Sequence, residues 1–356
     1  MGNNMAELQT LSDYLSSLKT TVYLTSHTKS ASLKNDNVIL IVREDDTEQR
    51  LEIEKIRRLV IIGRAESVSS MVLYRLMTKK IPVDFLDVFC RPIGNLLPEE
   101  ADLNSLCLAQ EKLSISSKSL ECAKQLIRTK LHNCKEILRR RLSMHSISPD
   151  WNLFDHMLKY AGNMRSLRGA EGLAARKYFE QWNETVKYFT WTGRSRHPAL
   201  DEVNSVLSFG YTLLRNRISS ALRAHGLNPR LGFYHMTRGS HCALASDLME
   251  QFRPLVDTAV LSAIRRKTLT PDDFCKDAQD RIRFSSHSGF SKVLSLFEEM
   301  FNDQKTVYRC NESSQNKVTK SVNDLLDDCA ENFALMLQDR VEYSTWRIGS
   351  GTVFSH

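Results

Sequence analysis

The order of apolar and polar residues divides the chain into a strand-rich segment and a helical segment. Between residues 20 and 92, short β-branched runs separated by polar turns predict four strands, Thr21–Leu24, Val38–Val42, Leu59–Ile62 and Val83–Asp87. One helix, capped within residues 67–70, is expected among them, with Met71, Leu73, Tyr74 and Met77 on its buried side. From Leu103 onward, apolar residues recur at helical spacing instead. We therefore predict an α+β protein with a β-rich N-terminal domain and an all-helical second domain.

A short segment rich in proline and glycine sets the expected domain boundary. Residues 91–98 read Arg-Pro-Ile-Gly-Asn-Leu-Leu-Pro, a composition that interrupts regular structure. We expect the β-rich domain over residues 1–92, a linker over 93–100, the helical domain over 101–345 and a tail over 346–356. The polar stretch Arg309–Thr319 is predicted to be a flexible loop.

The composition is that of a globular protein without membrane segments. Of the 356 residues, 42% are hydrophobic and 26% are charged. No apolar run approaches the roughly 20 residues that a membrane-spanning helix needs. The N-terminus lacks a secretion signal, so we expect a cytoplasmic protein. The eight cysteines form no Cys-x-x-Cys pair, which excludes the usual zinc-finger and thioredoxin motifs.

Basic residues gather in one part of the helical segment. The chain carries 49 Lys and Arg against 42 Asp and Glu, a net charge of +7. Within it, Lys112–Arg141 holds nine basic and two acidic side chains. Such a run is typical of a solvated helix face. The alternative is a surface that binds phosphates, where each contact releases counterions and adds affinity for any nucleic-acid sequence.

Two acids and a histidine form the first candidate site. Asn-Pro and a glycine at 228–232 mark a turn before His235, and Asp247 and Glu250 are expected on one face of a helix that begins at Ser240 or Ser246. Two acids on one face repel each other unless a cation lies between them. Carboxylates with one imidazole suit Mg²⁺ or Mn²⁺ better than Zn²⁺. The alternative is that these acids pair with nearby basic side chains, namely Arg253, Arg238 or Lys292.

A second candidate segment surrounds one acid with small residues. Residues 167–178 contain two glycines and three alanines around Glu171. Because these residues have little side-chain bulk, another element or a phosphate backbone can approach closely there. Taken alone, Glu171 has the pattern of an ordinary solvated acid.

Three strings in this order resemble a known family. They are Arg-Gly-Ala-Glu-Gly-Leu-Ala-Ala-Arg-Lys-Tyr-Phe at 168–179, Gly-Phe-Tyr-His at 232–235 and Asp-Leu-Met-Glu-Gln-Phe-Arg-Pro at 247–254. Together they resemble the signature of the CRISPR-associated integrase family, the larger subunit of the complex that captures foreign DNA as new spacers. Asn204–Leu214 and strand patterns in the N-terminal half are similar as well, so the resemblance runs from about residue 20 to about 305.

The resemblance implies a set of site residues. It implies that Glu171, His235 and Glu250 bind Mg²⁺ or Mn²⁺, with Asp247 as a further acid of the site. His241, in the connecting loop, is an additional candidate ligand. Four arginines near these ligands in sequence are candidates for holding DNA phosphates, or else for pairing with local acids: Arg168, Arg176, Arg238 and Arg253.

The resemblance also implies an activity and partners. Metal-dependent transesterification would insert captured double-stranded DNA into a CRISPR repeat, and attack by water would make the same site an endonuclease. The family forms homodimers that assemble with a small ferredoxin-like partner into a heterohexamer. The competing functions are a stand-alone nuclease on branched DNA, a transposon-type integrase of the same fold, and a DNA-binding scaffold without activity.

Overall fold

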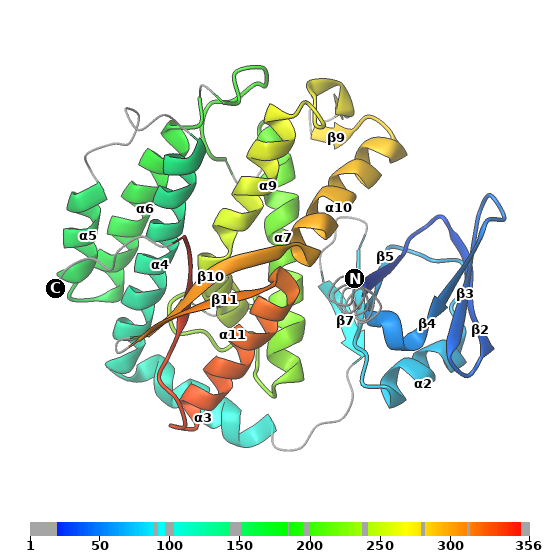
Figure 1. Ribbon diagram of the computed structural model, residues 1–356, viewed down its shortest axis with the longest axis horizontal. Coiled ribbons are helices and arrows are strands. Elements are labelled where there is room, and N and C mark those ends of the chain that lie inside the picture. Colours follow the sequence, from blue (N-terminus) through cyan, green and yellow to red (C-terminus); the bar gives the residue numbers. More distant parts are fainter. Residues whose placement is uncertain are drawn as a thin grey trace, which may run out of the picture. The chain divides into compact units, whose positions relative to one another are not determined.

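The computed structural model describes residues 20–87, 92–96, 103–141, 151–183, 185–195, 199–236, 241–278, 282–311 and 314–349. The chain divides into two units, Met1–Glu100 and Ala101–His356 (Figure 1). Strands dominate the described part of the first unit and helices that of the second, which confirms the predicted α+β class. Within the described ranges, no helix is both long enough and apolar enough to cross a membrane.

The described residues of the first unit form two small sheets and one α-helix. In one sheet, β5 (Ile56–Ile62) lies parallel to both β1 (Thr20–Leu24) and β6 (Val83–Leu86), and β7 (Pro92–Leu96) pairs antiparallel with β6. The other is an antiparallel meander of β2 (Thr28–Asn35), β3 (Val38–Arg43) and β4 (Glu48–Glu52). Central parallel strands are covered on both faces, which explains why β5 ends in an unbroken buried apolar run, Leu59–Ile62.

The buried side of helix α2 (Ser70–Thr78) differs in part from the one predicted. Val72 and Leu76, one turn apart, are fully buried, whereas Met71 and Tyr74 are 56% and 64% exposed. The prediction that Met71 and Tyr74 are buried was therefore wrong. Leu73 and Met77, the other two residues predicted on the buried side, are partly buried and pack against the same core as Val72 and Leu76.

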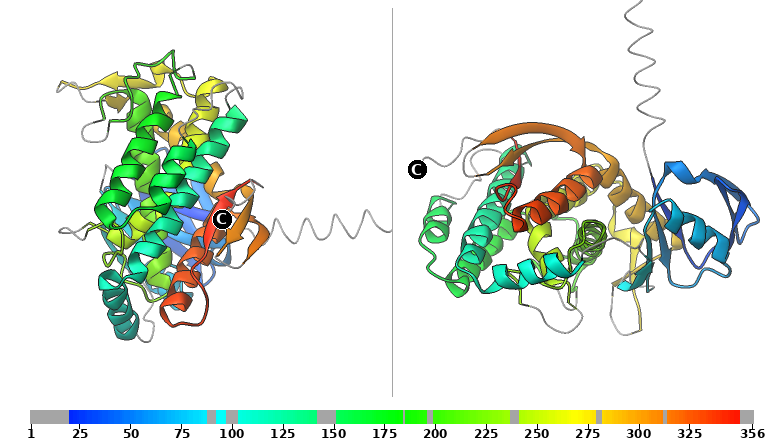
Figure 2. Two further views of the ribbon diagram at one scale, coloured as in Figure 1. Left: turned by 90° about the vertical axis from the view of Figure 1, so that its left-hand side faces the viewer. Right: turned by 90° about the horizontal axis from the view of Figure 1, so that it is seen from below.

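The second unit is mainly helical. Its described α-helices are α3 (Leu103–Ile115), α4 (Lys118–Arg141), α5 (Trp151–Lys159), α6 (Met164–Glu180), α7 (Glu202–Ala224), α8 (Ala243–Leu248), α9 (Arg253–Arg265), α10 (His287–Asn302) and α11 (Val322–Leu337). Helix α7 packs against α8, α9 and α11, while α4 packs against α5, α6 and α9. Figure 2 shows these helices from two further sides. The site described below lies where α4, α6 and the segment after α8 meet.

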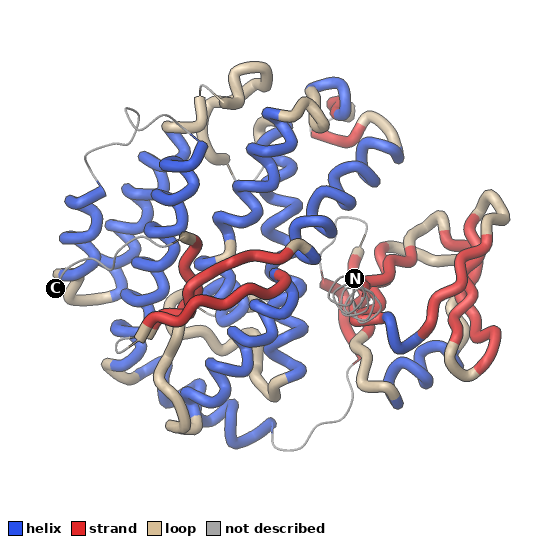
Figure 3. The backbone as a smooth tube through the Cα atoms, in the orientation of Figure 1, coloured by secondary structure: helices blue, strands red, loops and turns tan. Residues whose placement is uncertain are grey.

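Strands within the second unit depart from the all-helical domain expected there. A short hairpin pairs β8 (Phe274–Lys276) with β9 (Ile282–Phe284). A three-stranded antiparallel sheet has the order β11 (Gln315–Ser321), β10 (Gln304–Cys310), β12 (Thr345–Ile348), and Figure 3 draws it in red among the blue helices. The predicted flexible loop Arg309–Thr319 thus falls largely on β10 and β11. Their polar residues pair across a hairpin, and β10 also pairs with β12, which lies farther along the chain; local hydrophobic periodicity does not reveal this pairing.

The expected linker and tail also overlap strands. Part of the segment 93–100 forms β7, and residues 97–100 lie outside the described residues. The expected tail begins inside β12, where Trp346 is buried. The side chain of Asn133 on α4 holds this strand, since it donates to the Trp346 carbonyl at 3.0 Å and accepts from the Ile348 N–H at 2.7 Å. Residues 350–356 lie outside the described residues.

Side chains pack so closely against Gly210 of α7 that an added methyl group has no room. A Cβ added at Gly210 would lie 2.6 Å from Phe297 Cε1 and 2.7 Å from Val256 Cγ1, and both of these side chains are fully buried. We expect Gly210→Ala to lower the free energy of unfolding by about 1–3 kcal/mol, measured by urea denaturation. The control is Gly172→Ala on α6, where an added Cβ meets nothing within 4 Å and helix propensity predicts a gain of up to about 1 kcal/mol. Equal effects of the two changes would contradict this description of the core.

Candidate functional site

Helix α6 presents Glu171 at the edge of the helical core. The helix begins with a reciprocal capping box between Asn163 and Ser166. Its buried stripe is Leu167, Ala170, Ala174 and Tyr178. Glu171 is next to Ala170 at the edge of this stripe, and its side chain is 17% exposed. The acid therefore faces the interior, unlike the solvated acid that its local sequence alone suggests.

A buried carboxylate shapes the loop that carries His235. Asp247 accepts hydrogen bonds from the backbone N–H groups of Phe233 at 2.7 Å, Tyr234 at 3.0 Å and His235 at 2.7 Å. It also lies 2.7 Å from Nδ1 of the His235 ring. Because an ionised carboxylate only accepts hydrogen bonds, the neutral ring carries its proton on Nδ1 and leaves the Nε2 lone pair free. Asp247 is thus placed to position His235.

Gly232 permits this close approach. A Cβ at position 232 would lie 2.7 Å from Asp247 Oδ2 and 2.9 Å from the Ala243 backbone. Any side chain here would push the loop away from the carboxylate that holds it.

The helix expected to carry Asp247 and Glu250 on one face is broken between them. Helix α8 ends at Leu248, and Met249–Gln251 form a 3₁₀ turn. The residue before α8 is Cys242, whose side chain makes no cap, so the predicted start at Ser246 was wrong; Ser240 lies outside the described residues. The break gives the two acids different partners, which removes the repulsion that the sequence predicted.

Glu171 and Glu250 meet at one lysine from a third helix. The ammonium of Lys130 on α4 contacts Glu171 Oε1 and lies 2.7 Å from Glu250 Oε2. The other oxygen of Glu250, Oε1, lies 3.0 Å from Arg253 Nε and 3.9 Å from His235 Nε2. We call these five residues, Lys130, Glu171, His235, Glu250 and Arg253, the candidate site. Segments far apart in the chain therefore converge here, but the role of each residue remains a prediction.

The cations of the site keep Glu250 charged despite burial. Burial raises the pKa of Glu250, but Arg253, then Lys130 and His235, outweigh it and hold that pKa well below its usual range. For Lys130, burial is the largest single influence and lowers the pKa. The negative charges of Glu171 and Glu250 together outweigh it, so the pKa of Lys130 lies above the usual value for lysine. The ion pairs are thus the condition for burying these groups together.

The donor set fits a divalent ion. Glu250 Oε2 is buried and meets Lys130 without normal hydrogen-bond geometry. The distance between Nε2 of His235 and Oε1 of Glu250 is 3.9 Å, which is too long for a hydrogen bond. When the ring is neutral, each of these two atoms has a lone pair that can bind a metal ion. Two ligands of one Mg²⁺ ion lie roughly 3–4 Å apart. Among the described residues, no three His, Cys, Asp or Glu side chains are already grouped as a metal site, and Lys130 stands between the two glutamates.

The basic run at 112–141 is not a uniform solvated face. It covers all of α4 and the end of α3, and Lys130 lies within a buried stripe of α4 that includes Ile127, Leu131 and Cys134. Sequence reasoning counted Lys130 as surface charge. Its spacing of three and four residues from buried apolar neighbours is the signal that marks it as an interior residue.

The other predicted basic residues have different positions. Arg168 on α6 is exposed, donates to the carbonyl of Tyr234 and lies 5.5 Å from that ring, so it supports the His235 loop. Arg176 is exposed on the same helix, and Arg253 pairs with Glu250. Lys292 pairs with Asp273 rather than with the site. Arg238 lies outside the described residues.

His241 lies beside the site with a different partner. Its Nε2 is 3.2 Å from the Ser246 hydroxyl, and its ring centroid is 6.4 Å from that of His235. Partial burial, followed by the charge of Arg215, lowers the pKa of His241.

A buried hydrogen-bond network lies under the candidate site. Asp257 on α9 accepts from the hydroxyl of Tyr178 on α6 at 3.0 Å and from the hydroxyl of Tyr211 on α7. The guanidinium of Arg253 lies 4.7 Å from the Tyr211 ring centroid. This network links α6, α7 and α9 and so helps to hold the helix of Glu171 against the segment of Glu250. Sequence reasoning did not identify these three residues.

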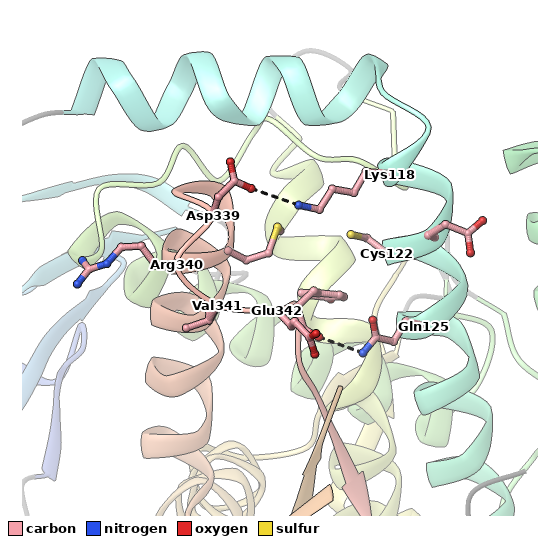
Figure 4. A pocket seen from close by; sticks show the side chains of 10 residues that line it. Lys118, Cys122, Gln125, Asp339, Arg340, Val341 and Glu342 are labelled. Carbon is pink, nitrogen blue, oxygen red and sulfur yellow. Dashed lines mark hydrogen bonds and ion pairs between the residues drawn. The ribbon is translucent and has the colours of Figure 1, made fainter. Parts of the chain in front are cut away.

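A separate pocket of about 440 Å³ lies at the other end of α4. Its lining includes Lys118 and Gln125 of α4 and residues after α11. Lys118 Nζ lies 3.6 Å from Asp339 Oδ1, and Gln125 donates to the Tyr343 carbonyl at 3.1 Å (Figure 4). The pocket contains none of the predicted site residues.

The buried carboxyl of Asp257 predicts a pH dependence of stability. Burial raises its pKa from 3.8 to about 6, and the tyrosine hydrogen bonds only partly oppose this shift. A raised carboxyl pKa means that the folded state binds more protons, so this contribution to stability falls as pH rises between about 4 and about 6. We expect wild type to lose about 2 kcal/mol relative to Asp257→Asn between pH 4.5 and pH 7, measured by urea denaturation. Parallel pH profiles for the two proteins would contradict the assignment.

Solved structures of other proteins share this fold. The chain superposes on a casposase bound to integration product with a TM-score of 0.75, 22% identity and coverage of 90% of this chain and 91% of that one. It superposes on a Cas1 protein from Thermotoga maritima with a TM-score of 0.72 and 21% identity, covering 93% of this chain and all of that one. At these identities the likeness shows the fold.

Sequence comparison extends the likeness to a family. The chain is 29% identical to "CRISPR-associated endonuclease Cas1 4" of Methanospirillum hungatei over 289 residues, 80% of each chain. It is 31% identical to "CRISPR-associated endonuclease Cas1 1" of Thermus thermophilus over 250 residues, 69% of this chain and 75% of that one. The family model described as "CRISPR associated protein Cas1" matches residues 22–299, which includes every described residue of the candidate site. This chain therefore belongs to the Cas1 family of CRISPR-associated proteins, as its three motifs predicted.

Proposed function

We propose that this protein is a metal-dependent DNA integrase and endonuclease that inserts captured foreign DNA into a CRISPR array as new spacers. The candidate site is the observation that carries the proposal. Carboxylates of Glu171 and Glu250, from separate elements, meet at one cation, and Nε2 of His235 lies beside Glu250. Membership of the Cas1 family supports the proposal, because relatives from two other organisms are named CRISPR-associated endonucleases.

The proposed reaction is a transesterification at phosphorus. The 3′-hydroxyl oxygen of the captured DNA forms a bond to a phosphorus at the edge of a repeat, the bond from that phosphorus to the repeat's own 3′-oxygen breaks, and a proton passes to this leaving oxygen. A Mg²⁺ or Mn²⁺ ion held by Glu171, His235 and Glu250 would polarise the phosphoryl oxygen and lower the pKa of the attacking hydroxyl. With water as the attacking group, the same bond is hydrolysed, which gives the endonuclease activity.

The surrounding residues prepare the site for DNA. Asp247 holds the His235 ring so that Nε2 is free to bind. Arg168 and Arg176 are exposed on the helix of Glu171 and are suited to contact phosphates. Added Cβ atoms at Gly169 and Gly172 would meet nothing within 4 Å, so this side of α6 is open to an approaching backbone.

Membership of the family and the likeness to one chain of a solved complex support the proposed assembly. The chain superposes on a "Cas6-RT-Cas1--Cas2 complex" chain with a TM-score of 0.70 and 23% identity, covering 90% of this chain and 35% of that one. We propose that this protein forms a homodimer, binds protospacer and repeat duplexes, and joins a small ferredoxin-like partner in a heterohexamer. Its β-rich N-terminal unit would supply the dimer contact.

A transposon-type integrase is the second candidate. The casposase likeness favours it, because that superposition covers nine-tenths of both chains. The two functions differ in partner dependence. Half-site integration that requires the small partner and a repeat duplex supports spacer acquisition, whereas integration of DNA ends without them supports the alternative.

Loss of any predicted metal ligand should remove strand transfer. We expect Glu171→Gln, His235→Ala and Glu250→Gln each to reduce Mn²⁺-dependent half-site integration by about 100-fold or more, because the glutamine variants lose a carboxylate charge and one oxygen and the alanine variant loses the imidazole nitrogen. Glutamine retains the volume and avoids leaving a void beside Lys130.

The matched control lies on the same helix as Glu171. Glu180 pairs with Lys177 at the exposed end of α6, and Glu180→Gln should leave integration unchanged. Duplex binding, measured by fluorescence anisotropy, should persist in all four variants. Integration at the wild-type rate by a ligand variant would remove that residue from the site.

A further inference from the structure

Lys130 occupies an unusual place for a lysine. It lies on the buried side of α4, is 7% exposed, and has the fully buried Leu126 and Ile127 near it on the same helix. A buried ammonium is costly unless charged partners compensate for the lost water. Its ion-pair partners in the described structure are Glu171 and Glu250, the two acids assigned above to the metal.

The second cation of the site is anchored differently. Arg253 faces the opposite oxygen of Glu250, at 3.0 Å, and its guanidinium also lies 4.7 Å from the Tyr211 ring centroid. Arg253 therefore has a contact, the Tyr211 ring, that does not involve either glutamate. Lys130 instead bridges the two acids, and its ammonium stands between the oxygens that an incoming ion would bind.

We propose that Lys130 is a resident cation that holds Glu171 and Glu250 together in the metal-free protein and competes with the divalent ion for them. The inference rests on the proposed function, since it takes these acids as metal ligands. A divalent ion brings two positive charges to the site, so the carboxylates no longer need the ammonium once the ion is bound. Removing the ammonium then has two opposite effects: the metal-free fold becomes less stable, and metal binding becomes tighter. A lysine with a purely structural role would produce only the first effect.

The test compares Lys130→Gln with a matched change on the same helix. Lys124 pairs with Glu121 at 3.3 Å on the outer part of α4, so Lys124→Gln is the control. Thermal unfolding of the metal-free proteins and calorimetric titration with Mn²⁺ alone are the measurements. We expect Lys130→Gln to lower the Tm by about 4 °C or more and to bind Mn²⁺ about tenfold more tightly than wild type. Lys124→Gln should change neither quantity.

A second variant keeps the inference testable if Lys130→Gln does not fold. Lys130→Arg preserves the charge, and its guanidinium can form a two-point pair with a carboxylate. We expect it to keep the wild-type Tm and to bind Mn²⁺ more weakly than wild type; equal or tighter binding would overturn the inference.

The outcomes separate this inference from the proposed function. Wild-type protein that binds no Mn²⁺ would overturn both. Wild-type protein that binds Mn²⁺, together with a folded Lys130→Gln variant that binds it equally or more weakly, would overturn the competition and leave the proposed metal site standing.

Discussion

Two carboxylates that meet in a protein interior repel each other unless a cation lies between them, and the candidate site is organised by this constraint. Lys130 bridges Glu171 and Glu250, and Arg253 occupies the remaining oxygen of Glu250. Lys130, Glu171 and Glu250 come from different parts of the chain, so the charges join α4, α6 and the segment after α8 at one point. Breaking one pair would leave a buried charge without compensation, which is far more costly than losing a surface salt bridge.

The backbone around the site follows from the same requirement. Asp247 and Glu250 are three residues apart, and the change from α helix to 3₁₀ turn between them directs Asp247 to the His235 loop and Glu250 to Lys130. Asp247 satisfies three backbone N–H groups at once, so the loop has little freedom to rearrange. Asp257 on α9 accepts hydrogen bonds from Tyr178 on α6 and Tyr211 on α7, and so links the three helices that support the site. A precise arrangement of ligands is what catalysis by positioning requires.

The sequence predicted the long amphipathic helices and the early strands, because their apolar periodicity is strong. It also led to the family through three motifs, which comparison with relatives confirmed. Other features depend on distant partners. Val72 and Leu76 reach the core of the first unit while Met71 and Tyr74 do not, and the polar strands β10 and β11 are held by a ladder that includes β12. Lys130 lies in a basic run that is typical of a helix surface, and only its contacts with acids from other elements show that it is part of the candidate site.

The central claim is that Glu171, His235 and Glu250 surround one position for a divalent ion. Crystals of the protein grown with Mn²⁺ and measured at the manganese absorption edge test it most directly. The account predicts one anomalous peak bonded to a carboxylate oxygen of Glu171, a carboxylate oxygen of Glu250 and Nε2 of His235. A fully occupied manganese ion bound elsewhere, with these three side chains making no bond to it, would contradict the account.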